Sequence, residues 1–172
     1  MNPNVHILGS RPSLVSQVLA SKHALTFAAL ADSRGVIGAK DGLTTTQIRT
    51  AITTKAAGNS LAALPESLSA SQLSAFLQSG SILVDTSASD TTMPIIKEAL
   101  SRGCGVVLAN KKPLSGSWAE AEALFASSNL RCESTVGAGL PVIAIVDLNV
   151  APAPLSPVLR KKFWGHAVVV FG

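Results

Sequence analysis

The sequence contains few aromatic, cysteine and charged residues, and each shortage argues against a class of protein. Aromatic residues make up 4% of the 172 residues and tyrosine is absent, whereas nucleic-acid-binding surfaces interleave aromatic with basic side chains. Cys104 and Cys132 show no CxxC or Cys/His spacing, so neither a zinc site nor a disulfide framework is indicated. No stretch reaches the roughly eighteen consecutive apolar residues of a membrane span. We therefore expect neither a nucleic acid nor a membrane as a partner.

The formal net charge of +4 is concentrated near the C-terminus. Arg160, Lys161 and Lys162 are adjacent there, and the remaining basic residues nearly balance the 10 acidic ones. This pattern indicates a short basic tail on a near-neutral body rather than a basic binding face. The N-terminus shows no basic region followed by a long apolar run, which predicts a cytoplasmic protein, with a plastid as the alternative compartment.

Apolar runs alternate with segments of helical periodicity along the chain. The runs predict buried strands at residues 5–8, 25–31, 81–84, 105–109 and 131–135. The periodic segments predict helices from residue 12 and over residues 44–57, 71–77, 93–101 and 117–127, with loops at 33–43 and 59–70. Continuous apolar strands separated by helices predict an α/β fold with a doubly wound, mostly parallel, Rossmann-like sheet and helices on both faces.

The C-terminal segment does not continue this pattern. Residues 150–157 contain three prolines in VAPAPLSP, which excludes a helix or a central strand throughout. We therefore expect one domain at residues 1–147, followed by a divergent, proline-rich and basic tail at residues 148–172. A terminal apolar run at residues 166–171 suits either an edge strand or a poorly packed tail.

Polar clusters follow three of the predicted strands, at residues 85–90, 110–112 and 133–140. Successive parallel strands place such clusters on one rim of the sheet, where ligands of these folds bind. The sequence thus predicts a site at this rim. Lys111 and Lys112 directly follow a buried strand, and their alternative interpretation is that they are solvated loop charges.

Three segments resemble homoserine dehydrogenases: Val84–Ser89 (VDTSAS), Val106–Leu114 (VVLANKKPL) and Glu133–Ile143 (ESTVGAGLPVI). Their order and spacing fit that family. The match is strong over residues 81–144 and weaker over residues 4–35. The resemblance implies an NAD(P)-binding domain.

The resemblance also implies a reaction, the NAD(P)-dependent interconversion of L-homoserine and L-aspartate 4-semialdehyde in threonine, methionine and isoleucine biosynthesis. Ser87 and Ala88 would line the nicotinamide side of the cofactor, and Lys111 would lie between cofactor and substrate. A lysine ammonium there would polarise the aldehyde oxygen and stabilise the alkoxide formed by hydride addition. It would also serve in a proton relay. Lys112 would face solvent or a phosphate.

The third segment resembles the family's monovalent-cation site. Its implied ligands are an oxygen of Glu133 and the backbone carbonyls of Val136, Ala138 and Leu140, and oxygen ligands suit a hard cation such as sodium. The alternative interpretation is a plain turn that precedes a helix.

The phosphate-binding turn departs from the G-x-G-x-x-G pattern of dinucleotide-binding folds. Gly9 takes the first glycine position, but Arg11 and Leu14 take the second and third. We expect Gly9, Ser10 and Arg11 to contact the cofactor, with Arg11 either crowding the pyrophosphate or pairing with it. Two residues at the end of the next strand bear on cofactor choice, because an acid there binds ribose hydroxyls and a base holds a 2′-phosphate. They are Asp32 and Arg34, which leave NAD and NADP both open, and plain loop charges are the alternative.

The second departure is that the match ends near Ala144. In the family a substrate and dimerisation domain follows and supplies a second catalytic lysine and acidic substrate ligands. We therefore expect a truncated enzyme whose activity is incomplete. The alternatives are an inactive dinucleotide-binding or regulatory fragment that pairs with a full-length relative as a homo- or hetero-oligomer, and a non-functional fragment.

Overall fold

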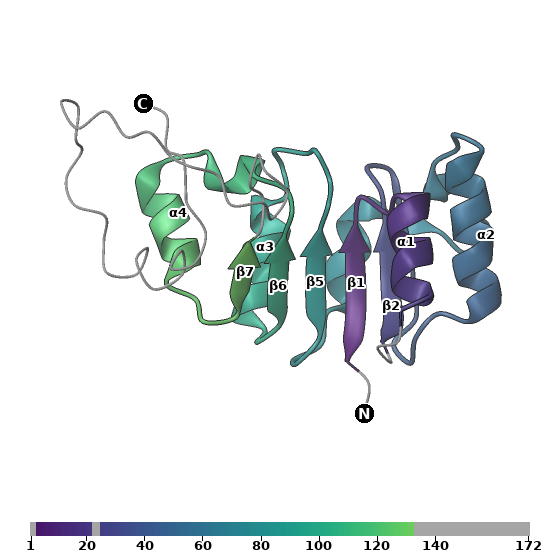
Figure 1. The fold of residues 1–172 in the computed structure, drawn as a ribbon, viewed down its shortest axis with the longest axis horizontal. Coiled ribbons are helices and arrows are strands. Elements are labelled where there is room, and N and C mark those ends of the chain that lie inside the picture. The colour runs from purple at the N-terminus through teal and green to yellow at the C-terminus, as the bar shows by residue number, and fades with distance from the viewer. Residues whose placement is uncertain (1–2, 22–24, 133–172) are drawn as a thin grey trace.

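The computed structural model describes residues 3–21 and 25–132, which form a seven-stranded mixed sheet flanked by helices (Figure 1). The strand order is β4-β3-β2-β1-β5-β6-β7. The first crossover therefore runs outward from β1 to β2, and the chain then returns past β1 to β5, which is the reversal that defines a doubly wound sheet. The predicted fold class is confirmed.

Five strands of the sheet are parallel, and their carboxyl ends define one edge. They are β1 (Asn4–Leu8), β2 (Thr26–Ala31), β5 (Ile82–Asp85), β6 (Gly105–Leu108) and β7 (Leu130–Cys132). The register pairs Leu8 with both Ala31 and Asp85, and Asp85 with Leu108. The loops that leave β1, β2, β5 and β6 therefore start side by side.

The predicted loop at residues 33–43 is wrong, because it contains the antiparallel strand β3 (Gly35–Gly38). Its glycines are required by packing rather than by a turn: a Cβ on Gly35 would lie 2.5 Å from the Ala62 backbone nitrogen, and one on Gly38 would lie 2.9 Å from the Phe76 ring. The predicted connection at residues 59–70 likewise contains a two-residue edge strand, β4 (Leu68–Ser69).

Within the described residues, four α-helices and three 3₁₀-helices connect the strands. The α-helices are α1 (Pro12–Leu19), α2 (Thr45–Ala56), α3 (Met93–Ser101) and α4 (Trp118–Phe125). Thr44 begins α2 through a reciprocal capping box with Gln47. The segment predicted as an α-helix at residues 71–77 is instead a 3₁₀-helix, and the three such helices are η1 (Leu61–Ala63), η2 (Ala70–Phe76) and η3 (Lys112–Leu114).

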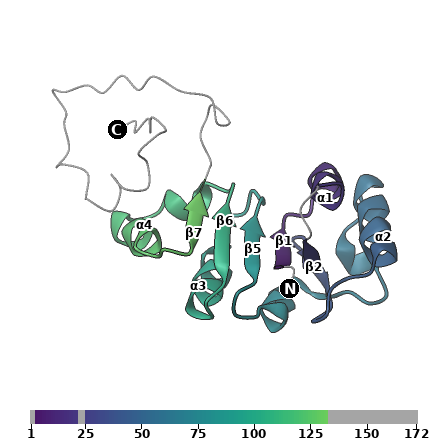
Figure 2. The ribbon, with the colours of Figure 1, turned by 60° about the horizontal axis from the view of Figure 1, so that its bottom comes forward.

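Two apolar clusters pack on opposite faces of the sheet. One joins α1, α2 and η1 to β1 and β2, and the other joins η2, α3 and α4 to β5, β6 and β7. Figure 2 shows α1 and α3 on opposite sides of the sheet. Within the described residues, the face of β6 that carries Val107 is thinly covered, since this central valine is 37% exposed.

Several predictions fall on residues outside the described ranges. These are the last part of the predicted strand at 131–135, the domain boundary between residues 147 and 148, and the tail at residues 148–172. No helix among the described residues is long and apolar enough to cross a membrane.

Candidate functional site

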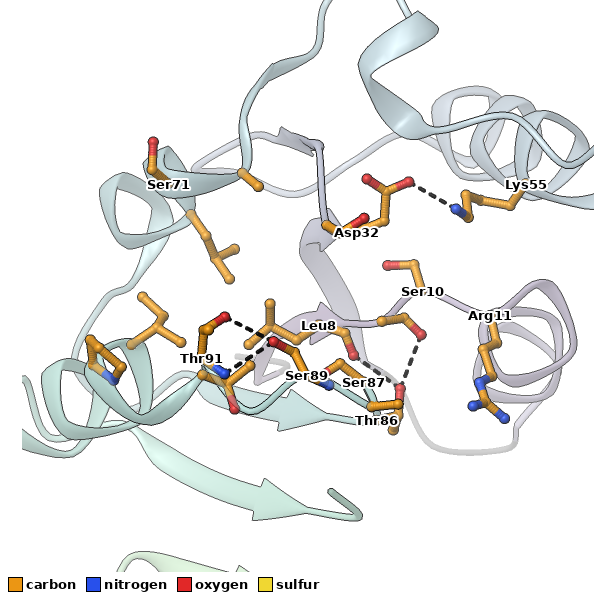
Figure 3. Close-up of a pocket in the computed structure, with 18 of the residues that line it drawn as sticks. Leu8, Ser10, Arg11, Asp32, Lys55, Ser71, Thr86, Ser87, Ser89 and Thr91 are labelled. Atoms are coloured by element: carbon orange, nitrogen blue, oxygen red, sulfur yellow. Dashed lines mark hydrogen bonds and ion pairs between the residues drawn. The ribbon is translucent and has the colours of Figure 1, made fainter. Parts of the chain in front are cut away.

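A cavity of about 860 Å³ opens where β1, β2 and β5 end (Figure 3). This is the edge that the polar clusters predicted. Six of the predicted cofactor-binding residues line the cavity, namely Gly9, Ser10, Arg11, Asp32, Ser87 and Ala88.

The turn between β1 and α1 forms the floor of this cavity. Gly9 has a φ of +76°, and a Cβ at this residue would lie 2.7 Å from the backbone of Ser87. Glycine is thus required here both by the left-handed backbone and by the close approach of the β5–α3 loop. The Ser10 hydroxyl lies 3.1 Å from the carbonyl oxygens of Ile7 and Ala31, to which it donates, and so anchors the turn to β1 and β2.

Arg11 occupies the second position of the glycine pattern without distorting the turn. It lies at the N-cap of α1 in an extended conformation, and its side chain makes no capping hydrogen bond. Figure 3 shows its guanidinium directed away from Asp32 and Lys55. Leu14, at the third position, packs against the apolar cluster under α1. The first turn of α1 therefore begins with no side-chain cap and with a cation beside it.

The loop after β5 is tied to the β1–α1 turn by Thr86. Its hydroxyl donates to the carbonyls of Leu8 and Gly9, at 3.0 and 3.1 Å. Ser87, the next residue, donates its backbone N–H and its hydroxyl to Asp85 Oδ1, at 2.9 and 2.7 Å. The side of the cavity formed by Ser87, Ala88 and Ser89 is thus held by hydrogen bonds to the β1–α1 turn and to the end of β5.

Asp32 lies at the end of β2, and its carboxylate is fully engaged. Its side chain is 8% exposed. Burial alone would raise the pKa of this carboxyl, but the Lys55 ammonium and three backbone N–H groups outweigh burial and hold the pKa well below its usual range. The donors to Oδ1 are Arg34 N, Gly35 N and Ser60 Oγ at 2.9, 3.0 and 3.2 Å, and the donors to Oδ2 are Lys55 Nζ and Leu61 N, both at 2.8 Å.

Arg34 and Lys111 are the predicted cofactor residues that do not line the cavity. Arg34 is exposed in the turn between β2 and β3, one residue beyond the cavity-lining Ser33. Lys111 is exposed at the N-cap of η3. It directly follows Asn110, whose amide lies 3.3 Å from Ser87 Oγ, so its backbone belongs to the same rim. Lys112 is also exposed.

The predicted cation ligands Glu133, Val136, Ala138 and Leu140 lie outside the described residues. Within residues 3–21 and 25–132, no group of three or more His, Cys, Asp and Glu side chains is arranged to hold a metal ion.

Sequence reasoning missed several residues that line the cavity. Lys55 comes from α2, 23 residues after its partner Asp32, and no local motif marks such a distant ion pair. An apolar wall comes from η2 and α3, segments for which the sequence predicts helices but no site residue. The members of this wall are Leu73, Pro94 and Ile95.

The cavity therefore combines three chemical features. Arg11 and Lys55 supply positive charge, the uncapped start of α1 supplies backbone N–H groups that suit an anion, and Leu73 and Ile95 supply apolar surface. Such an arrangement suits a ligand with both anionic groups and a flat apolar part.

Comparisons with solved structures show what the fold resembles. A hyperthermophilic archaeal homoserine dehydrogenase in complex with NADPH matches with a TM-score of 0.60 and 23% identity, over 78% of this chain and 44% of that one. The homoserine dehydrogenase from Thermoplasma acidophilum matches with a TM-score of 0.57 and 18% identity, over the same shares of the two chains. A protein of unknown function from Candida auris matches with a TM-score of 0.56 and 23% identity, over 82% and 41%.

At these identities the likeness establishes the fold. The resemblance to homoserine dehydrogenases predicted from the motifs is confirmed at that level, since solved structures of that family share the fold of this chain. The chain spans less than half the length of the structures it matches. Neither the protein-family models nor the curated proteins give a match.

Proposed function

We propose that this chain is the dinucleotide-binding part of a homoserine dehydrogenase-like oxidoreductase and that it binds NADP(H). The observation that carries the proposal is the position of Gly9, Arg11, Asp32 and Ser87 around one cavity at the carboxyl edge of a doubly wound sheet. This edge is where such sheets bind dinucleotides. A solved structure that shares the fold holds NADPH.

The state of Asp32 favours NADP(H) over NAD(H). A free carboxylate at this position would accept hydrogen bonds from the ribose hydroxyls of NAD, but five donors already occupy both oxygens of Asp32. The Lys55 ammonium contacts one oxygen of that carboxylate and the backbone N–H of the exposed Arg34 contacts the other, and the side chains of both residues carry N–H donors of the kind that suits a 2′-phosphate. The adenosine end of the cofactor would lie here, with its base against Leu73 and Ile95.

The pyrophosphate would lie at the start of α1. Two of the glycines usual in this turn are replaced, so the side chain of Arg11 supplies charge in place of a close backbone approach. The nicotinamide end would then lie toward Ser87, Ala88 and Lys111. When bound, the reduced cofactor would donate a hydride to the aldehyde carbon of aspartate semialdehyde, and the alkoxide would take up a proton to give homoserine; in reverse, the oxidised cofactor would accept the hydride from homoserine.

Lys111 is the proposed catalytic residue. Its exposed position after β6 leaves the ammonium available to a substrate at the rim. There it would donate to the aldehyde oxygen and stabilise the negative charge that develops on it. By the same resemblance, we propose that Glu133, Val136, Ala138 and Leu140 bind a sodium ion.

A second candidate function is a dinucleotide-binding module without turnover that pairs with a longer relative. It is favoured by the replacement of two turn glycines by Arg11 and Leu14.

The first experiment is a titration of the purified chain with NADPH and NADH, followed by nicotinamide fluorescence and thermal unfolding. Bound cofactor at a hundredfold excess over its dissociation constant should stabilise the chain by about 2.7 kcal/mol. We expect binding of NADPH to be tighter than that of NADH. Failure of both cofactors to bind at millimolar concentration would overturn the proposal.

Turnover separates the two candidate functions. Homoserine-dependent reduction of NADP that is lost in Lys111→Ala but kept in Lys40→Ala would establish the dehydrogenase. Both lysines are exposed, and Lys40 lies outside the cavity. Cofactor binding without turnover would favour the binding module.

A further inference from the structure

A buried carboxylate–amide pair joins the loops that follow β5 and β6. Asn110 Nδ2 donates to Asp85 Oδ2 at 3.1 Å. Asp85 is fully buried and Asn110 is 4% exposed. Neither side chain lines the cavity, and the proposed function gives neither a role.

The Asn110 amide reaches across to the loop that bounds the cavity. Its NH₂ group lies 2.7 Å from the Ser89 carbonyl oxygen and 3.3 Å from Ser87 Oγ. Its carbonyl Oδ1 accepts the backbone N–H of Lys112 at 3.1 Å. One side chain therefore holds the Ser87–Ser89 side of the cavity with its donors and the Lys111–Lys112 backbone with its acceptor.

The chemistry of these contacts restricts which residue can occupy each position. An amide is both donor and acceptor, whereas an isosteric aspartate is acceptor-only when ionised. Asp85 accepts from Ser87 twice and from Asn110 once. Asp85 forms no ion pair with any of the described residues. Neutral hydrogen-bond donors alone therefore satisfy this buried carboxylate. Burial of a carboxylate without a cation beside it lowers the free energy of unfolding, which suggests that Asp85 is kept for a role in the site.

We propose that Asn110 and Asp85 are positioning residues that set the spacing between the Ser87–Ser89 side of the cavity and Lys111. Together they hold the nicotinamide-facing loop and the proposed catalytic lysine as one unit. Displacement of reacting groups by about 1 Å is enough to lower rates by roughly a hundredfold. This inference rests on the proposed function.

The test compares two ligands on variants of Asn110. NADPH spans the whole site, whereas adenosine 2′,5′-bisphosphate carries only the end proposed to contact Arg34, Lys55 and the apolar wall. Asn110→Asp replaces the donor with a carboxylate that repels Asp85 and the Ser89 carbonyl. Asn129→Asp makes the same chemical change at an exposed position away from the cavity and serves as the control.

We expect Asn110→Asp to weaken NADPH binding at least tenfold, to change bisphosphate binding less than threefold, and to leave a cooperative thermal transition. The Asn129→Asp control should bind both ligands like the parent chain. If Asn110→Asp does not fold, Asn110→Ser decides by the same criterion, because the shorter side chain removes the amide contacts to Ser89 and Asp85 without adding a charge.

Equal weakening of both ligands would mean that Asn110 only supports the fold, and unchanged binding of both would mean that its contacts are dispensable. Either result would overturn the positioning role. A failure of the proposed function is distinguishable, because the parent chain itself would then bind neither ligand, and the inference would fall with it.

Discussion

The ammonium of Lys55 lies 2.8 Å from Asp32 Oδ2 and joins the end of β2 to the last turn of α2 at the rim of the cavity. This ion pair makes Asp32 a structural acceptor, since it also binds the backbone N–H groups that start β3 and η1. An ammonium has three N–H donors, so Lys55 keeps further donors for a ligand after it binds Asp32. The two residues therefore have separate and testable roles.

Asp32→Asn should lower stability without weakening NADPH binding. The amide cannot satisfy Lys55 and the backbone N–H groups together, so the free energy of unfolding should fall by about 2 kcal/mol. Loss of the negative charge should leave NADPH affinity unchanged or raised, because a carboxylate repels a 2′-phosphate. Urea unfolding and NADPH titration measure the two effects, with the exposed Asp41→Asn as the control. A large loss of NADH affinity with intact stability would instead identify Asp32 as a ribose ligand.

Lys55→Met should discriminate between the two cofactors. Removal of the ammonium takes away the proposed partner of the 2′-phosphate, and we expect NADPH affinity to fall about tenfold, equivalent to about 1.4 kcal/mol. NADH lacks that phosphate, so its affinity should change by less than about threefold. Fluorescence titrations of both cofactors give the ratio. Lys40→Met, at an exposed position outside the cavity, should change neither affinity. An equal loss for both cofactors would contradict the assignment.

The glycine of the β1–α1 turn should not tolerate a side chain. Gly9→Ala would put a methyl group 2.7 Å from the Ser87 backbone at a φ of +76°. Strain in the left-handed region costs about 1–2 kcal/mol, and the contact should bring the total loss of stability to about 3 kcal/mol or more. Displacement of the Ser87 loop should also weaken NADPH binding.

Gly58→Ala is the matched control for this substitution. Gly58 has a φ of +80°, but a Cβ there would meet nothing within 4 Å. Gly58→Ala should therefore lower the free energy of unfolding only by the cost of the left-handed backbone, about 1–2 kcal/mol in chemical denaturation. Cofactor affinity should not change. Equal losses at the two glycines would show that the approach of Ser87 to Gly9 has no energetic consequence.

The parallel half of the fold could be predicted from sequence because its strands are continuous apolar runs. Residues 81–84 and 105–109 are of this kind, and each run ends in a polar cluster that lies at the predicted edge. The antiparallel strand β3 was missed because Gly35 and Gly38 suggest a loop. The close contacts that require those glycines, with Ala62 and Phe76, are formed only in the tertiary structure.

The candidate site was predictable where the residues stand in local motifs and not where they meet through space. The segment Ser87–Ala88 and the turn Gly9–Arg11 line the cavity as expected. The sequence does not predict that hydrogen bonds occupy both oxygens of Asp32. Three of the donors come from distant segments of the chain, at Lys55 and at Ser60–Leu61. Local spacing suggested a ribose-binding acid, whereas packing of α2 and η1 against the end of β2 determines what that carboxylate binds.

His6 should make the chain sensitive to mild acid. It lies in β1, is fully buried, and neither ring nitrogen has a partner among the described residues. Burial lowers the pKa of His6 to about 4, from 6.5. The unfolded chain therefore binds the proton more tightly, so stability is complete above pH 6.5 and falls as the pH drops toward 4. Over that window the loss from His6 should reach about 3 kcal/mol.

Urea unfolding at several pH values between 7 and 4.5 measures this loss, with His6→Leu as the comparison. Leucine is similar in size and does not titrate, so the variant should lose little stability across the same window. Asp32 does not mask the effect, because its lowered pKa removes stability only as the pH falls below about 4, the usual value for an aspartate. Parallel pH dependences for the parent chain and His6→Leu would show that other groups govern its acid sensitivity.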